Sequence, residues 1–210
     1  MSALNTGKAS VGHLEDNSVI RKRTEDEEQL EVKQMIEKLQ LKPHIEGGYY
    51  RRTFQSSLKF NTSWSSTDAD KSSLDLANND SVVSNACQRH ICSSIYYLLT
   101  KQSPICCWHK NRSDIIRYFH GGGSMKVFTI DDIGLLQTFR LGGNVEAGDR
   151  LQIVSKGGNW EALMLVDGDW ALQGEAVAPG FDHRDWELGT RELLHKFPDL
   201  ADTIQLFLKE

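Results

Sequence analysis

The sequence predicts a mainly β fold, an antiparallel sandwich or barrel with one helix before it and helices after it. From His90 to about residue 179, short β-branched and aromatic runs follow one another, separated by Gly, Asp and Asn turns. Strands at such short spacing are typical of antiparallel sandwiches and barrels rather than of folds that alternate strands with helices. Helical periodicity appears only near the two ends of the chain.

The chain begins with a segment that we expect to be a disordered tail. Residues 1–25 mix Ser, Gly, Asn and charged residues without periodicity. In the segment that follows, the spacing of Val32, Met35, Ile36 and Leu39 places apolar side chains on one face of a helix. We expect this amphipathic helix to pack on a sheet, within a single domain that spans residues 26–210.

A strand and a long polar segment come next. The Gly47–Gly48 pair leads into an aromatic, β-prone run that ends near Gln55. Residues 59–84 are rich in Ser, Asn and Asp, and we expect a long polar surface loop there.

The remaining strands and the C-terminal helices complete the plan. Residues 184–208 return to helical spacing, with an apolar group on either side of Pro198. The predicted strands between the loop and these helices are 90–100, 105–110, 115–120, 124–130, 135–141, 150–156, 160–166 and 172–179.

Composition limits the partners and the compartment. With 210 residues, 39 % apolar and 25 % charged, the chain suits one soluble domain. A net charge of −5 and the absence of a basic stripe argue against a nucleic-acid partner. No apolar run approaches the roughly 18 residues of a membrane helix, and none at the N-terminus would serve as a secretion signal. We therefore expect no membrane partner, a cytoplasmic location and four free thiols.

Four blocks of the sequence carry a resemblance to a known family: LKPHIEGGYYR at 41–51, SIYYLL at 94–99, His109 with the Gly122 turn, and VAPGFD at 177–182. With these blocks the chain resembles the cupin 5 group of unknown function within the RmlC-like cupin superfamily, from about Val32 to Leu200. The resemblance implies a cupin jelly-roll barrel, the double-stranded β-helix, which is usually dimeric. It implies no settled reaction.

The hairpin of this family has a metal-binding spacing whose ligands are mostly replaced here. Cupin metal hairpins read His-x-His, three or four residues, Glu, six residues, Gly. This frame puts the first His on His109 and the Gly on Gly122, but Asn111 and Ile115 stand at the other two positions. At the position of a later metal-binding His of the family, this sequence has Glu161. Because a first-row divalent ion needs about three or four strong ligands, we expect no metal cofactor.

We expect a wet or ligand-filled interior instead. Asn111 and Ile115 should point inward with His109, and a polar interior is costly to bury dry. On the first strand Tyr49 and Arg51 share one face, while Tyr50 and Arg52 share the other. One pair should face the cavity and the other the solvent or a dimer partner; the family pattern favours Tyr49 and Arg51 for the cavity, and the sequence alone does not decide.

The candidate ligand-binding residues include some with an equally acceptable structural role. His44 and Glu46 could bind a ligand or hydrogen-bond the turn before the strand. Trp160 could stack on a planar ligand or pack in the core. The full set is His44, Glu46, Tyr49, Arg51, Tyr97, His109, Asn111, Trp160 and Glu161.

Two functions fit these residues. The first is a metal-independent small-molecule-binding protein for a nucleotide or nucleotide-sugar-like metabolite, with aromatic rings on the base and Arg51, Arg52 or Lys110 on the phosphates. The second is a metal-free sugar or nucleotide-sugar epimerase or isomerase. Its candidate catalytic residues are His109 as base, Tyr97 or Tyr118 as acid, and Asp182 as orienting carboxylate. Whether the protein is an enzyme stays open.

A homodimer is a separate expectation. The first strand region and its helix could pair across a two-fold axis and cover an exposed sheet edge.

Overall fold

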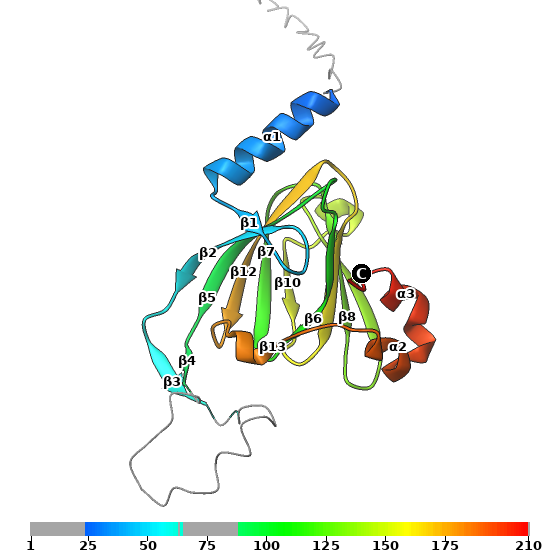
Figure 1. The fold of residues 1–210 in the computed structure, drawn as a ribbon. Helices are drawn as coiled ribbons and strands as arrows, with labels where there is room; N and C mark the ends of the chain where they lie inside the picture. Colours follow the sequence, from blue (N-terminus) through cyan, green and yellow to red (C-terminus); the bar gives the residue numbers. More distant parts are fainter. Residues whose placement is uncertain (1–23, 63, 65–87, 210) are drawn as a thin grey trace, which may run out of the picture.

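The computed structural model describes residues 24–62, 64 and 88–209, and its fold is a jelly roll of two facing antiparallel sheets with helices at both ends (Figure 1). In spatial order, the first sheet contains β1 (Lys42–Pro43), β2 (Tyr49–Gln55), β5 (Ser93–Thr100), β12 (Trp170–Ala178), β7 (Asp114–Gly122) and β10 (Gln152–Ser155). The second sheet contains β13 (Trp186–Leu188), β6 (Ile105–Asn111), β11 (Trp160–Leu165), β8 (Met125–Ile130) and β9 (Leu136–Leu141). Every strand that the sequence predicted is present in these sheets.

The N-terminal helix forms as predicted, but it does not lie on a sheet. Helix α1 (Glu25–Lys38) starts at a capping box in which the side chains of Thr24 and Glu27 each accept from the other's backbone N–H. Figure 1 shows α1 extending away from one end of the barrel. Its Glu28 forms an ion pair at 3.2 Å with Lys101, in the turn after β5. Val32, on the apolar face that predicted packing on a sheet, is buried beside Lys101 and Asp169 at this end of the barrel.

The polar segment begins with a strand rather than a loop. Lys59–Asn61 form β3, which pairs with β4 (Gln88–His90) as a separate two-stranded ribbon. Trp64 has the guanidinium of Arg112 4.8 Å from its ring centroid. The rest of the expected loop, and residues 1–23 of the expected tail, lie outside the described residues.

The C-terminal segment is only partly helical. Trp186–Leu188 form β13 beside β6, where helical spacing was predicted throughout. Helices α2 (Glu192–Lys196) and α3 (Ala201–Gln205) follow, with the 3-10 turn Pro198–Leu200 between them. Two more 3-10 turns, Val145–Ala147 and His183–Asp185, lie in earlier connections. None of the helices in the described part of the chain is long and apolar enough to cross a bilayer.

Two apolar clusters hold these layers together. One fills the space between the sheets and contains Tyr97, Leu99, Cys106, Met125, Val127, Leu141, Ile153, Leu163 and Ala171. The other joins the second sheet to the C-terminal helices through Trp108, Ile130, Trp160, Ala162, Leu193, Phe197, Ile204 and Phe207. The outward face of β6 and β11 is thus sealed by helices, and their inward face is left to line the interior.

A bulge in β6 decides which of its side chains face inward. Glu161 of β11 pairs with His109, whereas Leu163, two residues on, pairs with Cys106, three residues before His109. Strand β6 therefore carries one extra residue against β11. Because side chains alternate along a regular strand, Cys106 and His109 would otherwise face opposite ways. The bulge brings both into the interior.

Candidate functional site

The interior opens at one end of the barrel into a pocket with about 70 Å³ open to the centres of water molecules. One water molecule needs roughly 10–15 Å³ of such space, so the pocket has room for a few waters or for part of a ligand. Its lining combines buried charged groups with aromatic rings: His44, Glu46, Tyr50, Arg52, Ser93, Ile95, Tyr97, His109, Asn111, Ile115, Glu175, Val177, Phe181 and His183.

The loop between β1 and β2 carries Glu46 into this interior. Its backbone is pressed against β6: the N–H of Cys107 donates to the carbonyl of Glu46 at 2.7 Å. The hydroxyl of Tyr97 donates to the carbonyl of Gly47 at 2.6 Å. Gly47 has φ +106°, and a Cβ there would lie 2.1 Å from the carbonyl oxygen of Ile105. Glycine is therefore required for the loop to approach closely enough to insert Glu46.

His109 lies between two buried carboxylates. Its Nε2 is 3.0 Å from Oε1 of Glu161, and its Nδ1 is 3.5 Å from Oε2 of Glu46. The Nδ1 is also 2.9 Å from the backbone carbonyl of Cys107, to which it can donate a hydrogen bond. Burial acts to lower the pKa of His109, but attraction by the carboxylates of Glu46 and Glu161 outweighs it and holds this pKa well above its usual value. The imidazole is therefore a cation at neutral pH.

Arg117 continues the chain of charges. Its guanidinium is 2.8 Å from Oε2 of Glu161 and also forms an ion pair with Glu175. The amide of Gln173 donates to Glu175 at 2.7 Å. Although burial acts to raise it, the pKa of Glu161 falls well below its usual value because Arg117 and His109 attract its charged form. Burial raises the pKa of Glu175, so Glu175 is protonated more readily than Glu161.

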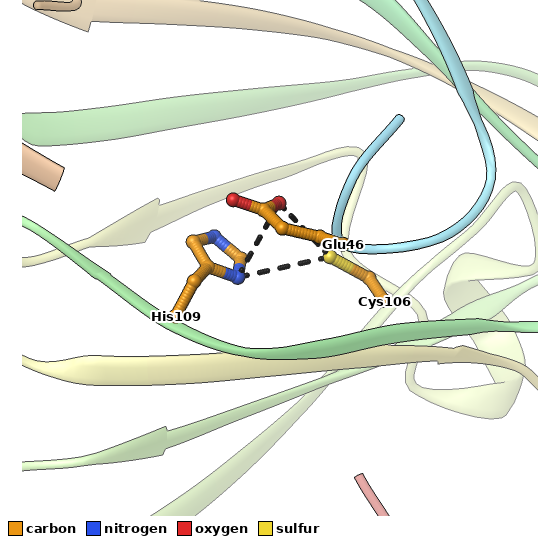
Figure 2. A group of neighbouring side chains, drawn as sticks. All are labelled: Glu46, Cys106 and His109. Carbon is orange, nitrogen blue, oxygen red and sulfur yellow. Dashed lines mark hydrogen bonds and ion pairs between the residues drawn. The ribbon is translucent and has the colours of Figure 1, made fainter. Parts of the chain in front are cut away.

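Glu46, Cys106 and His109 form a compact triangle (Figure 2), and two of its members, Glu46 and His109, also line the pocket. The thiol of Cys106 donates to Oε2 of Glu46 at 3.4 Å, and its sulfur is 3.7 Å from Nδ1 of His109. Burial raises the pKa of Cys106 to about 12, so the thiol keeps its proton here. The second oxygen of Glu46 accepts a hydrogen bond from the indole of Trp186 at 2.5 Å.

Aromatic rings surround the mouth of the pocket. His44 packs edge-on against Tyr50, with ring centroids 4.5 Å apart, and Phe181 packs edge-on against His183 at 5.0 Å. The Nδ1 of His44 accepts from the backbone N–H of Glu46 at 3.3 Å. Burial lowers the pKa of His44, so its ring is neutral at pH 7.

The structure decides the orientation of the first strand, which the sequence left open. Tyr50 and Arg52 line the pocket, and Tyr50 pairs with the inward-facing Tyr97. Tyr49 and Arg51, the pair that the family pattern favoured, lie on the other face. Arg51 sits there 5.7 Å from the ring centroid of Tyr96.

Three other predicted residues lie away from the pocket. Trp160 packs in the cluster under the C-terminal helices, where Lys110 covers its ring at 4.5 Å. Asp182 holds Arg184 at 2.7 Å at the surface and does not orient His109. Tyr118 is 38 % exposed on the outer face of β7. By contrast, Asn111 and Ile115 are buried and line the pocket beside His109, as expected.

Several residues of the interior were not anticipated: Cys106, Arg117, Glu175, His183 and Trp186. Strand alternation from Ile115 was a usable signal for Arg117, because residues two apart share a face. No local pattern reveals the others, because they meet only through pairing of strands that are distant in the sequence.

Comparison with known proteins gives a consistent family. Residues 33–189 match the family model Cupin_5, described as cupin superfamily (DUF985). An uncharacterized protein of Saccharomyces cerevisiae is 32 % identical over 170 residues, which are 78 % of this chain and 79 % of that protein.

Two solved structures are similar over most of their length. A hypothetical protein from Leishmania major has a TM-score of 0.70 and 26 % identity, covering 85 % of this chain and 98 % of that one. A protein from Shewanella oneidensis has a TM-score of 0.66 and 29 % identity, covering 84 % and 96 %.

Proposed function

Because the chain belongs to the Cupin_5 family of the cupin superfamily, we propose that it binds a small polar metabolite in the barrel, of the nucleotide or nucleotide-sugar class. One observation carries the proposal. Three buried ionisable side chains, Glu46, His109 and Glu175, line open space in the pocket together with apolar side chains such as Ile115 and Val177. Buried charges are costly unless they serve a partner or a ligand, and an open cavity beside them supports the second use.

The lining suits the chemistry of such a ligand in three parts. Carboxylates on the floor can accept hydrogen bonds from hydroxyl groups of a sugar. Tyr50, Phe181 and His183 at the mouth offer ring faces and edges to a planar base. Arg52 at the same mouth is a cation with a planar fork suited to phosphate. The small cavity takes only the polar head, so the larger part of the ligand would lie across the mouth.

A metal at the usual hairpin positions is not part of this proposal, because the residues there do not suit a divalent ion. Ile115 offers no donor atom. Glu161, which stands at the later ligand position, is already paired at 2.8 Å with the buried guanidinium of Arg117. That cation would repel a divalent ion bound by the same carboxylate.

The epimerase alternative gains no support from the geometry. His109 is held as a cation between two carboxylates, so it is poorly suited to remove a proton. The hydroxyl of Tyr97 is engaged by the carbonyl of Gly47. We therefore propose binding rather than proton transfer as the role of this pocket.

Thermal-shift and calorimetric titration with a panel of nucleotides and nucleotide sugars tests the proposal. At least one member should raise the melting temperature, and Arg52→Ala should weaken its binding by about tenfold or more, as expected for the loss of a charged hydrogen bond. Arg51→Ala is the matched control, because its side chain lies on the opposite face of the same strand. Binding that survives Arg52→Ala but not Arg51→Ala would contradict the proposed mouth, and no response to any panel member would contradict the ligand class.

A further inference from the structure

We propose that the Glu46–Cys106–His109 triangle is a zinc site, built from a donor set different from that of the metal hairpin. The inference goes beyond the proposed function, since it concerns a metal ion and requires no organic ligand. It uses Oε2 of Glu46, Sγ of Cys106 and Nδ1 of His109 (Figure 2).

The spacing of the three atoms fits one tetrahedral ion. Oε2 to Sγ is 3.4 Å, Oε2 to Nδ1 is 3.5 Å and Sγ to Nδ1 is 3.7 Å. Zinc bonds of about 2.0–2.3 Å to oxygen, nitrogen and sulfur require edges of about 3.3–3.6 Å between tetrahedral ligands. The three spacings therefore differ by only a few tenths of an ångström from those of tetrahedral zinc ligands.

The chemistry of the donors selects zinc over harder ions. A thiolate with an imidazole and a carboxylate suits Zn²⁺, whereas Mg²⁺ and Ca²⁺ prefer oxygen ligands throughout. Three protein ligands also leave a tetrahedral ion one coordination position for water or for an atom of a bound molecule.

Neighbouring residues already hold two of the ligands in the required orientation. Glu161 lies 3.0 Å from Nε2 of His109, the arrangement in which a carboxylate fixes the histidine tautomer and leaves Nδ1 for the metal. Trp186 donates to Oε1 of Glu46 and leaves Oε2 for the triangle. Outer partners of this kind are a regular feature of protein metal sites.

The competing use of the same atoms is a network without an ion. In that state the thiol of Cys106 donates to Glu46, and Nδ1 of His109 donates to the carbonyl of Cys107. Zinc would replace these protons, and thiolate and neutral imidazole would become ligands. The two states differ in whether sulfur is bonded to a metal, which spectroscopy detects directly.

The test uses the chelator-treated, reduced full-length chain, titrated with Zn²⁺ by calorimetry and with Co²⁺ as a spectroscopic probe. We expect about one equivalent of either ion to bind. The Co²⁺ form should show a thiolate-to-cobalt charge-transfer band and the intense visible bands of tetrahedral coordination. Bound Co²⁺ without the charge-transfer band, or no binding of either ion by the folded chain, would overturn the proposal.

Variants assign the ligands. Cys106→Ser should abolish the charge-transfer band, and Glu161→Gln should weaken Zn²⁺ binding by about 10–100-fold through the orientation of His109. Cys107→Ser is the matched control, an adjacent half-buried cysteine outside the triangle, and it should bind like the wild type. A band lost in Cys107→Ser but kept in Cys106→Ser would refute the assignment. Because the wild-type cobalt spectrum reports sulfur ligation by itself, the test holds even if a variant does not fold.

Discussion

At the scale of single residues, the interior depends on balanced charges. Arg117 is 1 % exposed, yet it carries a guanidinium with carboxylates on two sides. Burial acts to lower its pKa, but Glu161 and Glu175 outweigh burial and raise it. Removing one member of such a group leaves the others charged in a medium that solvates them poorly.

We expect Arg117→Met to lower the free energy of unfolding by about 3–5 kcal/mol, because Glu161 loses the cation that offsets its burial. Urea unfolding in the presence of chelator measures this without a contribution from bound ions. The double variant Arg117→Met/Glu161→Gln should be less destabilised than the single one, since it removes the orphaned charge. A single variant within about 1 kcal/mol of the wild type would contradict the role of the pair.

Asp149 provides a pH-dependent contribution far from the pocket. It accepts from Ser124 Oγ at 2.9 Å and from the N–H of Asn144 at 3.0 Å, and it pairs with Arg140. Burial acts to raise its pKa, but these partners together lower it. A carboxyl whose pKa is lower in the folded chain contributes stability that is present above its unfolded pKa and is lost as the pH falls through the folded pKa.

Asp149→Asn should therefore lower the free energy of unfolding at pH 7 by about 1–3 kcal/mol. The difference from the wild type should shrink below about pH 4, near the ordinary pKa of Asp. Urea unfolding at several pH values measures the trend, with the exposed Asp132→Asn as control. A deficit that stays constant down to acid pH would contradict the link to this carboxylate.

At the scale of elements, the loop between β1 and β2 and the bulge of β6 together bring the donor side chains into one place. The bulge turns Cys106 and His109 to the same side, and the N–H of Cys107 beside it donates to the carbonyl of Glu46. The three donor side chains therefore meet because a loop and a strand irregularity are matched.

Gly47→Ala tests this contact. A Cβ would lie 2.1 Å from the carbonyl oxygen of Ile105 while φ is +106°, so the loop must move away from β6. We expect a loss of several kcal/mol in unfolding free energy, on top of the roughly 1–2 kcal/mol that a left-handed conformation costs a residue with a Cβ. Gly158→Ala, at φ +87° with no atom within 4 Å, isolates that conformational cost. Equal losses in the two variants would contradict the close approach.

Elements were the part of the fold most accessible from sequence. Alternation of apolar and polar residues, with turn residues between the runs, located most strands, because a half-buried strand has apolar side chains on one face only. They did not reveal β13, a short segment whose strand state comes from pairing with β6. They also did not reveal where α1 packs, because the apolar face of a helix does not indicate which part of the fold it will contact.

At the scale of the whole molecule, the outer edge of β2 is open over part of its length. Among the described residues, β1 pairs with β2 only at Tyr49 and Tyr50, so no strand covers the outer edge of β2 beyond Tyr50. Nearby apolar side chains are exposed: Phe54 at 55 %, Leu58 at 65 % and Phe60 at 40 %. Open edges and exposed apolar side chains favour association with another chain.

We propose that two copies pair through this edge, and we expect a dimer at micromolar concentration in sedimentation velocity. Phe54→Lys should shift the population toward monomer by placing a charge at the edge. Ile133→Lys is the control, an 84 % exposed apolar side chain in the turn between β8 and β9. A wild-type chain that sediments only as a monomer would contradict the proposal.

The sequence by itself determined most strands of the two sheets, the N-terminal helix and the family, because these depend on local periodicity and on long contiguous blocks. It also identified His44, Glu46, Tyr97, His109 and Asn111 among the residues that line the pocket. Only the tertiary structure decided that Arg52 rather than Arg51 lies on the pocket side of β2, and that Cys106 joins Glu46 and His109. The physical reason is strand pairing. Tyr50 lies opposite the inward-facing Tyr97, which sets the face of β2 that lines the pocket. In β6, one extra residue reverses the alternation on which a sequence argument relies, and pairing with β11 fixes where that residue lies.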